Sequence, residues 1–136
     1  MEEFGLTGNF NGENVEFIEK LGIDNLKTFY FSRNKITNLK YLKNIKFKRL
    51  ERFWSISNEL NDIKEIMNIN NKESLKFINL RENKIKNLKE LLDMISHFPK
   101  LEKLILNDNE DIKEKEVEEM MKNIKEKYNR NLSIII

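Results

Sequence analysis

The chain has 136 residues, of which 35% are charged and 39% hydrophobic, and its net charge is +2. Without a clear excess of Lys and Arg, we do not expect nucleic acid as the main ligand, because binding a phosphate backbone requires clustered positive charge. The absence of cysteine excludes a disulfide-rich secreted scaffold, and no apolar stretch is long enough to cross a membrane. Together with the acidic start at Glu2 and Glu3, which is unlike a signal peptide, these features favour an intracellular protein, cytoplasmic or nuclear.

One pattern recurs along nearly the whole chain. An apolar residue is followed by others three and five positions later and by Asn eight positions later, as in Leu75, Ile78, Leu80 and Asn83. Copies start at residues 1, 26, 50, 75 and 101, so successive starts are 25, 24, 25 and 26 residues apart. The equivalent residues in the other copies are Met1, Phe4, Leu6 and Asn9 in a degenerate first copy, then Leu26, Phe29, Phe31 and Asn34, then Leu50, Phe53, Ser55 and Asn58, and finally Leu101, Leu104, Leu106 and Asn109.

The middle of each copy predicts a β-strand. Two apolar positions that are two residues apart lie on the same face of a strand, and the residues between them lie on the other face. Because the copies follow at nearly constant spacing, we expect their strands to form one parallel sheet. The Asn after each strand can both donate to and accept from the backbone, so Asn34, Asn58, Asn83 and Asn109 are predicted to form a structural ladder between copies.

After each Asn the apolar spacing changes from two to three or four residues, which predicts helical segments behind the sheet. The longest stripe should belong to a regular helix that ends near Tyr128, and Pro99 should end the preceding helix just before the strand at Leu101. The apolar residues of these segments are Ile36, Leu39 and Leu42, then Leu60, Ile63 and Ile66, then Ile85, Leu88, Leu91, Leu92 and Ile95, and finally Val117, Met120, Met121, Ile124 and Tyr128.

The last residues repeat the strand spacing, with Leu132, Ile134 and Ile136 two positions apart. We therefore predict a sixth strand near 132–136. Neither end of the chain carries a recognisable polar capping segment, and an uncovered strand at the edge of a sheet can pair with another chain. Either end of the sheet is therefore a candidate for edge-strand contact with a partner.

The pattern resembles that of leucine-rich repeat proteins, whose repeats are roughly 20–29 residues long. Residues 34–42 and 83–91 are similar to the short-repeat intracellular type, which includes phosphatase-regulating subunits, acidic nuclear phosphoproteins and the A-prime subunit of a spliceosomal particle. The last copy, with its longer helix, is similar to the ribonuclease-inhibitor type. The resemblance implies an α/β fold over 1–136 as a single domain, a solenoid with a parallel sheet on its concave face and helices or helical turns on its convex face.

The resemblance also implies a non-catalytic role in recognition or assembly through the concave face, without a cofactor. The residues expected on that face include Tyr30 and Trp54 at equivalent positions of adjacent copies, with Phe77 on the next strand. Aromatic side chains beside arginines are typical of protein interfaces. The alternative is that these rings pair across strands or are covered by the chain's own ends. The predicted partner-binding residues are Tyr30, Arg52, Trp54, Ile56, Phe77, Asn79, Arg81, Lys103 and Ile105.

A second interpretation concerns the basic segment 40–52, whose lysines are interleaved with Tyr41 and Phe47 and which is followed by Phe53. Basic and aromatic residues together can bind single-stranded nucleic acid. This leaves open a role as a scaffold or assembly subunit of a ribonucleoprotein or another large complex. A solvated charged face is nevertheless the favoured interpretation of the segment.

Metal binding and catalysis find little support in the sequence. The acidic segment 107–111 has a faint calcium-loop composition, but Ile112 stands where such a loop needs glycine, so we expect no metal. His97 is the single histidine and has no cysteine or phosphate-binding loop to work with. We therefore predict that the protein is not an enzyme.

Overall fold

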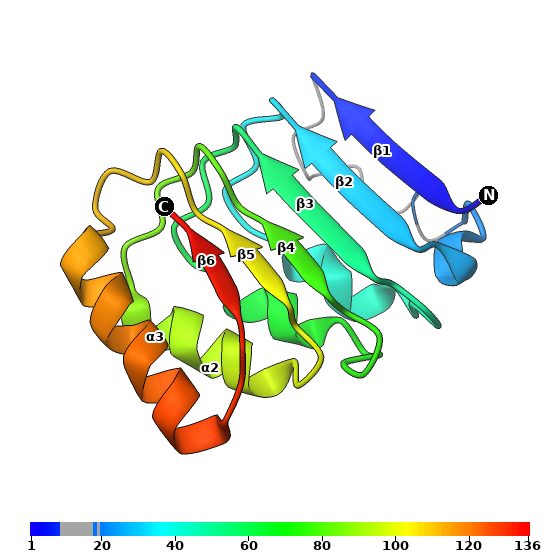
Figure 1. Cartoon of the computed structure of the whole chain (residues 1–136). Coiled ribbons are helices and arrows are strands. Elements are labelled where there is room, and N and C mark those ends of the chain that lie inside the picture. Colours follow the sequence, from blue (N-terminus) through cyan, green and yellow to red (C-terminus); the bar gives the residue numbers. More distant parts are fainter. Residues whose placement is uncertain (9–17, 19) are drawn as a thin grey trace.

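The computed structural model describes residues 1–8, 18 and 20–136. Its centre is one open parallel sheet of six strands, and the order of the strands in the sheet is their order along the chain (Figure 1). This α/β arrangement confirms the predicted parallel sheet, including its sixth strand. The strands are β1 (Glu3–Thr7), β2 (Thr28–Ser32), β3 (Arg52–Ile56), β4 (Phe77–Asn79), β5 (Lys103–Ile105) and β6 (Ser133–Ile135).

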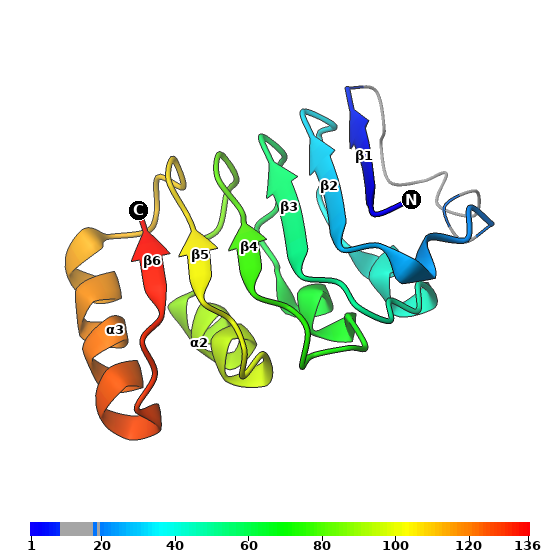
Figure 2. The same cartoon turned by 45° about the vertical axis from the view of Figure 1, so that its right-hand side comes forward.

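Helical segments between the strands all lie on one side of the sheet (Figure 2). Among the connections that the structure describes in full, those after β4 and β5 form α-helices. The connections after β2 and β3, which were predicted to form helices or helical turns, form short 3₁₀ turns. The described helical segments are η1 (Ile23–Asn25), η2 (Lys40–Asn44), η3 (Lys64–Asn68), α2 (Leu88–His97) and α3 (Glu114–Tyr128).

The difference between these connections follows from local composition. Asn87 caps the N-terminus of α2, since its side-chain Oδ1 accepts a hydrogen bond from the backbone amide of Glu90. Its side-chain Nδ2 also donates to the Glu90 carboxylate at 3.2 Å. Straight-chain residues, which favour helices, follow this cap. The η3 connection is instead rich in asparagine and has no side-chain cap, so only a short 3₁₀ turn forms there. As predicted, α2 ends just before Pro99.

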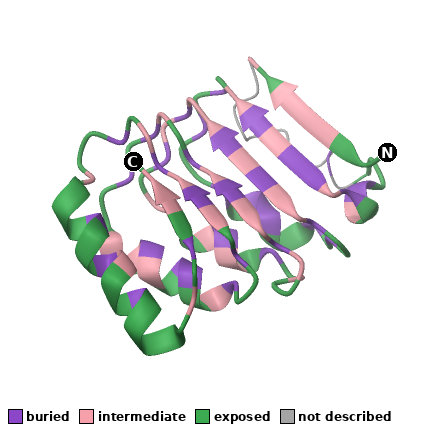
Figure 3. Ribbon diagram, in the orientation of Figure 1, coloured by how far each residue is buried: buried purple, intermediate pink, exposed green. Residues whose placement is uncertain are grey.

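The core lies between the sheet and the helical side (Figure 3). The apolar strand positions of the repeated pattern fill it, with Phe29, Phe53 and Leu104 completely buried. Among the described residues, three apolar positions of the predicted pattern are exposed. Met1, which precedes the edge strand β1, is 78% exposed, and Ile136, which follows the edge strand β6, is 39% exposed. Tyr128 is 42% exposed because it ends α3 beyond the last buried turn.

The Asn ladder joins adjacent copies through the turns that follow the strands. Asn58 Oδ1 accepts from the amides of Asn34 at 3.0 Å and Ile36 at 3.2 Å, both in the preceding copy. In the same way Asn83 Oδ1 accepts from the Leu60 amide, and Asn109 Oδ1 accepts from the Ile85 amide. These side chains satisfy backbone groups that the turns would otherwise leave buried and unpaired. Asn9, the degenerate first member, lies outside the described residues.

The residue before each Asn adopts a left-handed backbone conformation, which the sequence did not predict. The φ angles are 58° at Arg33, 55° at Ser57, 54° at Glu82 and 61° at Asp108. Non-glycine residues occupy this region at a cost of roughly 1–3 kcal/mol, so the surrounding turn must hold them there. The amides of Arg33, Ser57 and Glu82 donate to carbonyls of the next copy, as Ser57 N does to the carbonyl of Arg81 at 3.0 Å.

Within the part of the chain that the structure describes, no helix is both long enough and apolar enough to span a membrane. The strands β1 and β6 form the two edges of the sheet, since each pairs with a single neighbour among the described strands.

Candidate functional site

The face of the sheet opposite the helices carries the strand residues that alternate with the core positions. We call this surface the open face. The parallel register aligns its residues in rows that cross the strands, with cross-strand neighbours about 4.8 Å apart. One row contains Glu3, Thr28, Arg52, Phe77, Lys103 and Ser133, and the next contains Gly5, Tyr30, Trp54, Asn79, Ile105 and Ile135.

Tyr30 and Trp54 are direct cross-strand neighbours, and their ring centroids are 6.2 Å apart with the planes tilted by 42°. The Tyr30 ring also lies across Gly5 on β1. A methyl group at Gly5 would lie 2.0 Å from Tyr30 Cζ, so only glycine leaves room for the ring in this position. Tyr30 is therefore packed between β1 and Trp54. This contact agrees with the alternative of cross-strand pairing, yet both rings remain half-buried on the open face.

Arg52 lies beside this aromatic pair and contacts a third ring. Its guanidinium carbon is 5.4 Å from the centre of the Phe77 ring, within the range of a cation–π interaction. Its Nη1 atom is also 3.9 Å from a carboxylate oxygen of Glu51, the residue before it. The two contacts hold the guanidinium close to the sheet, between β3 and β4.

An open hollow of about 220 Å³ lies over β4, between β3 and β5. The short side chain of Asn79 stands between the larger Trp54 and Ile105 in one row, and Phe77 stands between Arg52 and Lys103 in the other. Six of the predicted partner-binding residues meet here. The residues that line the hollow are Arg52, Trp54, Phe77, Ile78, Asn79, Lys103 and Ile105.

Two other predicted residues lie beside the hollow and do not line it. Tyr30 reaches it only through its contact with Trp54. Ile56 ends β3 opposite Ser32 and is half-buried. Thr28, in the same row as Arg52, is only 2% exposed, because this short side chain stands between Glu3 and Arg52.

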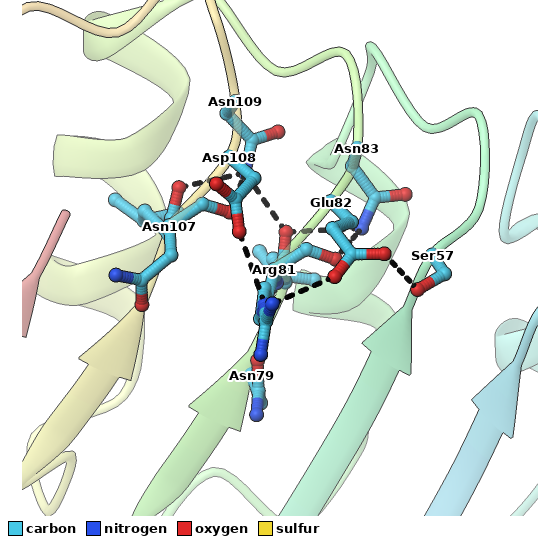
Figure 4. A network of polar contacts seen from close by, with 10 residues as sticks. Ser57, Asn79, Arg81, Glu82, Asn83, Asn107, Asp108 and Asn109 are labelled. Atoms are coloured by element: carbon cyan, nitrogen blue, oxygen red, sulfur yellow. Dashed lines mark hydrogen bonds and ion pairs between the residues drawn. The ribbon is translucent and has the colours of Figure 1, made fainter.

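Arg81, the remaining predicted residue, belongs to a polar network at the ends of the strands (Figure 4). Its guanidinium contacts the carboxylates of Glu82 at 2.9 Å and Asp108 at 3.1 Å, and the Ser57 hydroxyl donates to the other Glu82 oxygen at 2.5 Å. The sequence reasoning missed this network because Glu82 and Asp108 occupy the left-handed turn positions. The signal available in the sequence was a polar or charged residue directly before each Asn of the ladder.

The aromatic residues Tyr41 and Phe47 of the basic segment 40–52, and Phe53 directly after it, are buried in the core and cannot stack on bases. Two of its cations are paired within the protein: Lys48 Nζ is 2.7 Å from Asp24, and Arg49 Nε donates to the carbonyl of Asn25 at 2.8 Å. The segment therefore presents charge to solvent and no stacking surface.

In the described part of the chain, no three or more His, Cys, Asp or Glu side chains are arranged to hold a metal ion. In the segment 107–111, Asp108 is paired with Arg81, and Asn109 bonds to the backbone of its turn. The ring of His97 packs edge-on against Phe98, with centroids 4.9 Å apart. Burial, together with the charge of Lys72, lowers the pKa of His97, which keeps this imidazole neutral at neutral pH.

No protein-family model matches the chain, and no curated protein matches it in sequence.

Proposed function

We propose that this chain is an intracellular leucine-rich repeat solenoid that binds another protein through the open face of its sheet and catalyses no reaction. Three features support the repeat assignment. The copies follow at a spacing of 24 to 26 residues, their strands lie side by side in chain order, and the Asn ladder bonds each copy to the one before it.

The observation that carries the binding function is the apolar and aromatic composition of a sheet face that no described segment covers. Trp54, Phe77 and Ile105 are half-buried around one hollow, whereas a solvent-facing sheet surface that binds no partner would carry polar residues at these positions. A contiguous exposed apolar patch marks an interaction site. Trp beside Arg is also the composition of the few interface residues that dominate binding energy.

The size of the hollow favours a protein over a small molecule as partner. Sites that enclose small ligands have volumes of roughly 300–1,000 Å³ and bury most of the ligand surface. The hollow, at about 220 Å³, is smaller than this and lies within a broad sheet surface. It is therefore suited to one side chain of a partner whose remaining surface rests on the neighbouring rows.

The test is affinity capture with wild-type protein and Trp54→Ala, followed by mass spectrometry and measurement of the captured partner's affinity. Trp54→Ala should weaken binding by about 2 kcal/mol or more, which is roughly a 30-fold rise in Kd. Tyr128→Ala is the matched control, because it removes an exposed aromatic side chain from α3, on the other side of the sheet.

The proposal fails if Trp54→Ala abolishes folding while binding per folded molecule is unchanged. It also fails if Trp54→Ala and Tyr128→Ala weaken binding equally, since the open face would then contribute nothing specific.

A further inference from the structure

The polar groups around the hollow are donors. Arg52 and Lys103 contribute a guanidinium and an ammonium group from opposite sides. Asn79 contributes its amide nitrogen, because its Oδ1 already accepts a hydrogen bond from the Arg81 amide at 3.1 Å. Backbone groups of β4 are paired with β3 and β5 in the sheet. A ligand seated here therefore meets apolar walls, donors and positive charge, with few acceptors.

The positive charge around the hollow is only weakly compensated. Among the described residues, Arg52 forms an ion pair with Glu51 at the long distance of 3.9 Å. In the same part of the chain, Lys103 forms no ion pair. Arg81, beyond the end of β4, is neutralised by its contacts with Glu82 and Asp108. The acidic residue of the same row, Glu3, lies at the far edge of the sheet on β1.

From this complementarity, and resting on the proposed function, we propose that the partner presents an extended acidic segment. One large apolar side chain of the segment enters the hollow against Trp54, Phe77 and Ile105, and carboxylates on either side of it bind Arg52 and Lys103.

The spacing of the two cations agrees with such a segment. Arg52 and Lys103 stand two strands apart, so their backbones are separated by about 10 Å. Side chains on the same side of an extended peptide recur about every 6.6 Å. Carboxylates two residues before and two residues after the apolar residue therefore lie on the same side of the peptide as its side chain, about 13 Å apart. The length and flexibility of the Arg and Lys side chains cover the difference from about 10 Å, so both cations can be reached while the apolar side chain enters the hollow. Recognition uses side chains, because the strands under the hollow have no free edge.

The test is selection of a random peptide library on the full chain, followed by binding measurements with the most enriched peptide in synthetic form. We expect enrichment of Asp and Glu on both sides of a large apolar residue. The synthetic peptide should bind Lys103→Glu at least about tenfold more weakly than wild type, because a like charge replaces an attractive one. Lys89→Glu is the matched control, since it makes the same charge change on α2, behind the sheet, and should bind as wild type does.

Each other outcome overturns the acidic segment. Enriched peptides that lack acidic residues but lose binding with Trp54→Ala would exclude this partner chemistry and leave the open face as a protein-binding surface. Failure to enrich any peptide that depends on Trp54 would contradict both proposals. Salt-sensitive binding of an RNA oligonucleotide that Lys103→Glu abolishes would assign the hollow to nucleic acid. A dimer that Trp54→Ala dissociates would assign it to a second copy of the chain.

Discussion

The two faces of the sheet are built from the same strands, yet they differ in nearly every property. In β3, Phe53 and Ser55 are completely buried behind the sheet, while the residues that alternate with them, Arg52, Trp54 and Ile56, are half-buried on the open face. The core positions are apolar in nearly every copy, with Ser55 as an exception, whereas the open-face positions vary in chemical character from copy to copy. The comparison teaches that a single strand carries two sets of alternating residues, one of which supplies stability while the other forms the surface that we propose for recognition.

The strongest test of this comparison is truncation on the core side. Phe53→Ala should lower the free energy of unfolding by about 3–5 kcal/mol, because it leaves a cavity among rings such as that of Phe29, 6.4 Å away. Denaturant unfolding monitored by circular dichroism measures the loss. A loss below about 1 kcal/mol would mean that the core can collapse around the missing ring, and the division between the faces would be weaker than proposed.

The turns that join the copies should rank next. Asn83→Ala removes the acceptor for the Leu60 amide and a donor to the carbonyls of Ser55 and Leu80, so about 1–3 kcal/mol of stability should be lost. The exposed Asn61→Ala provides the matched control, with an expected change within about 0.5 kcal/mol. Equal unfolding midpoints for the two variants would contradict the structural role of the ladder.

On the open face, Trp54→Ala should cost less stability than Phe53→Ala, although it removes a larger side chain. We expect a loss of about 1–2 kcal/mol, because Trp54 is half-buried and its main ring contact is with Tyr30. The two variants are compared under the same denaturant conditions. If Trp54→Ala proves as destabilising as Phe53→Ala, this ring belongs to the core and the two faces are not functionally distinct.

A smaller effect should follow from Gly5→Ala. The added methyl group overlaps the Tyr30 ring, whose displacement from its preferred rotamer should cost about 0.5–1.5 kcal/mol. Trp54 is the only tryptophan of the chain, so its fluorescence reports the change in its contact with Tyr30. Thr7→Ala, an exposed change on the same strand, should leave the emission unaltered. Identical spectra for wild type and Gly5→Ala would show that Tyr30 does not depend on Gly5.

The smallest effect concerns charges that lie on neither face. Hydrogen bonds from Lys27 and Lys48 lower the pKa values of Glu2 and Asp24, respectively. Because these values are depressed in the folded state, the stabilisation is present above the ordinary carboxyl pKa and is lost as the pH falls below about 4. In the double variant Glu2→Gln with Asp24→Asn, the free energy of unfolding should therefore fall slightly less than in wild type as the pH is lowered below about 4. An equal fall in the two proteins would show that these exposed pairs contribute nothing measurable.

Much of the fold was predictable because its signals are local and periodic. The spacing of Phe53 and Ser55, repeated in each copy, placed the strands, and Pro99 placed the end of α2. The short 3₁₀ turns were less predictable, since apolar spacing indicates which residues face the core but not how many helical turns the intervening residues can form. The left-handed residues such as Glu82 were missed because non-glycine residues in this conformation leave no composition signal of their own.

The sequence by itself determined which side of the sheet each residue occupies, because alternation along a strand depends only on local geometry. It therefore predicted that Trp54, Phe77 and Ile105 share a face. Only the tertiary structure decided which of the predicted residues meet, because contacts between copies depend on strand register and on the neighbouring side chains. The strand register and the short Asn79 side chain form the hollow. The absence of a side chain at Gly5 leaves room for the Tyr30 ring, and the carboxylates of the turns form ion pairs with Arg81.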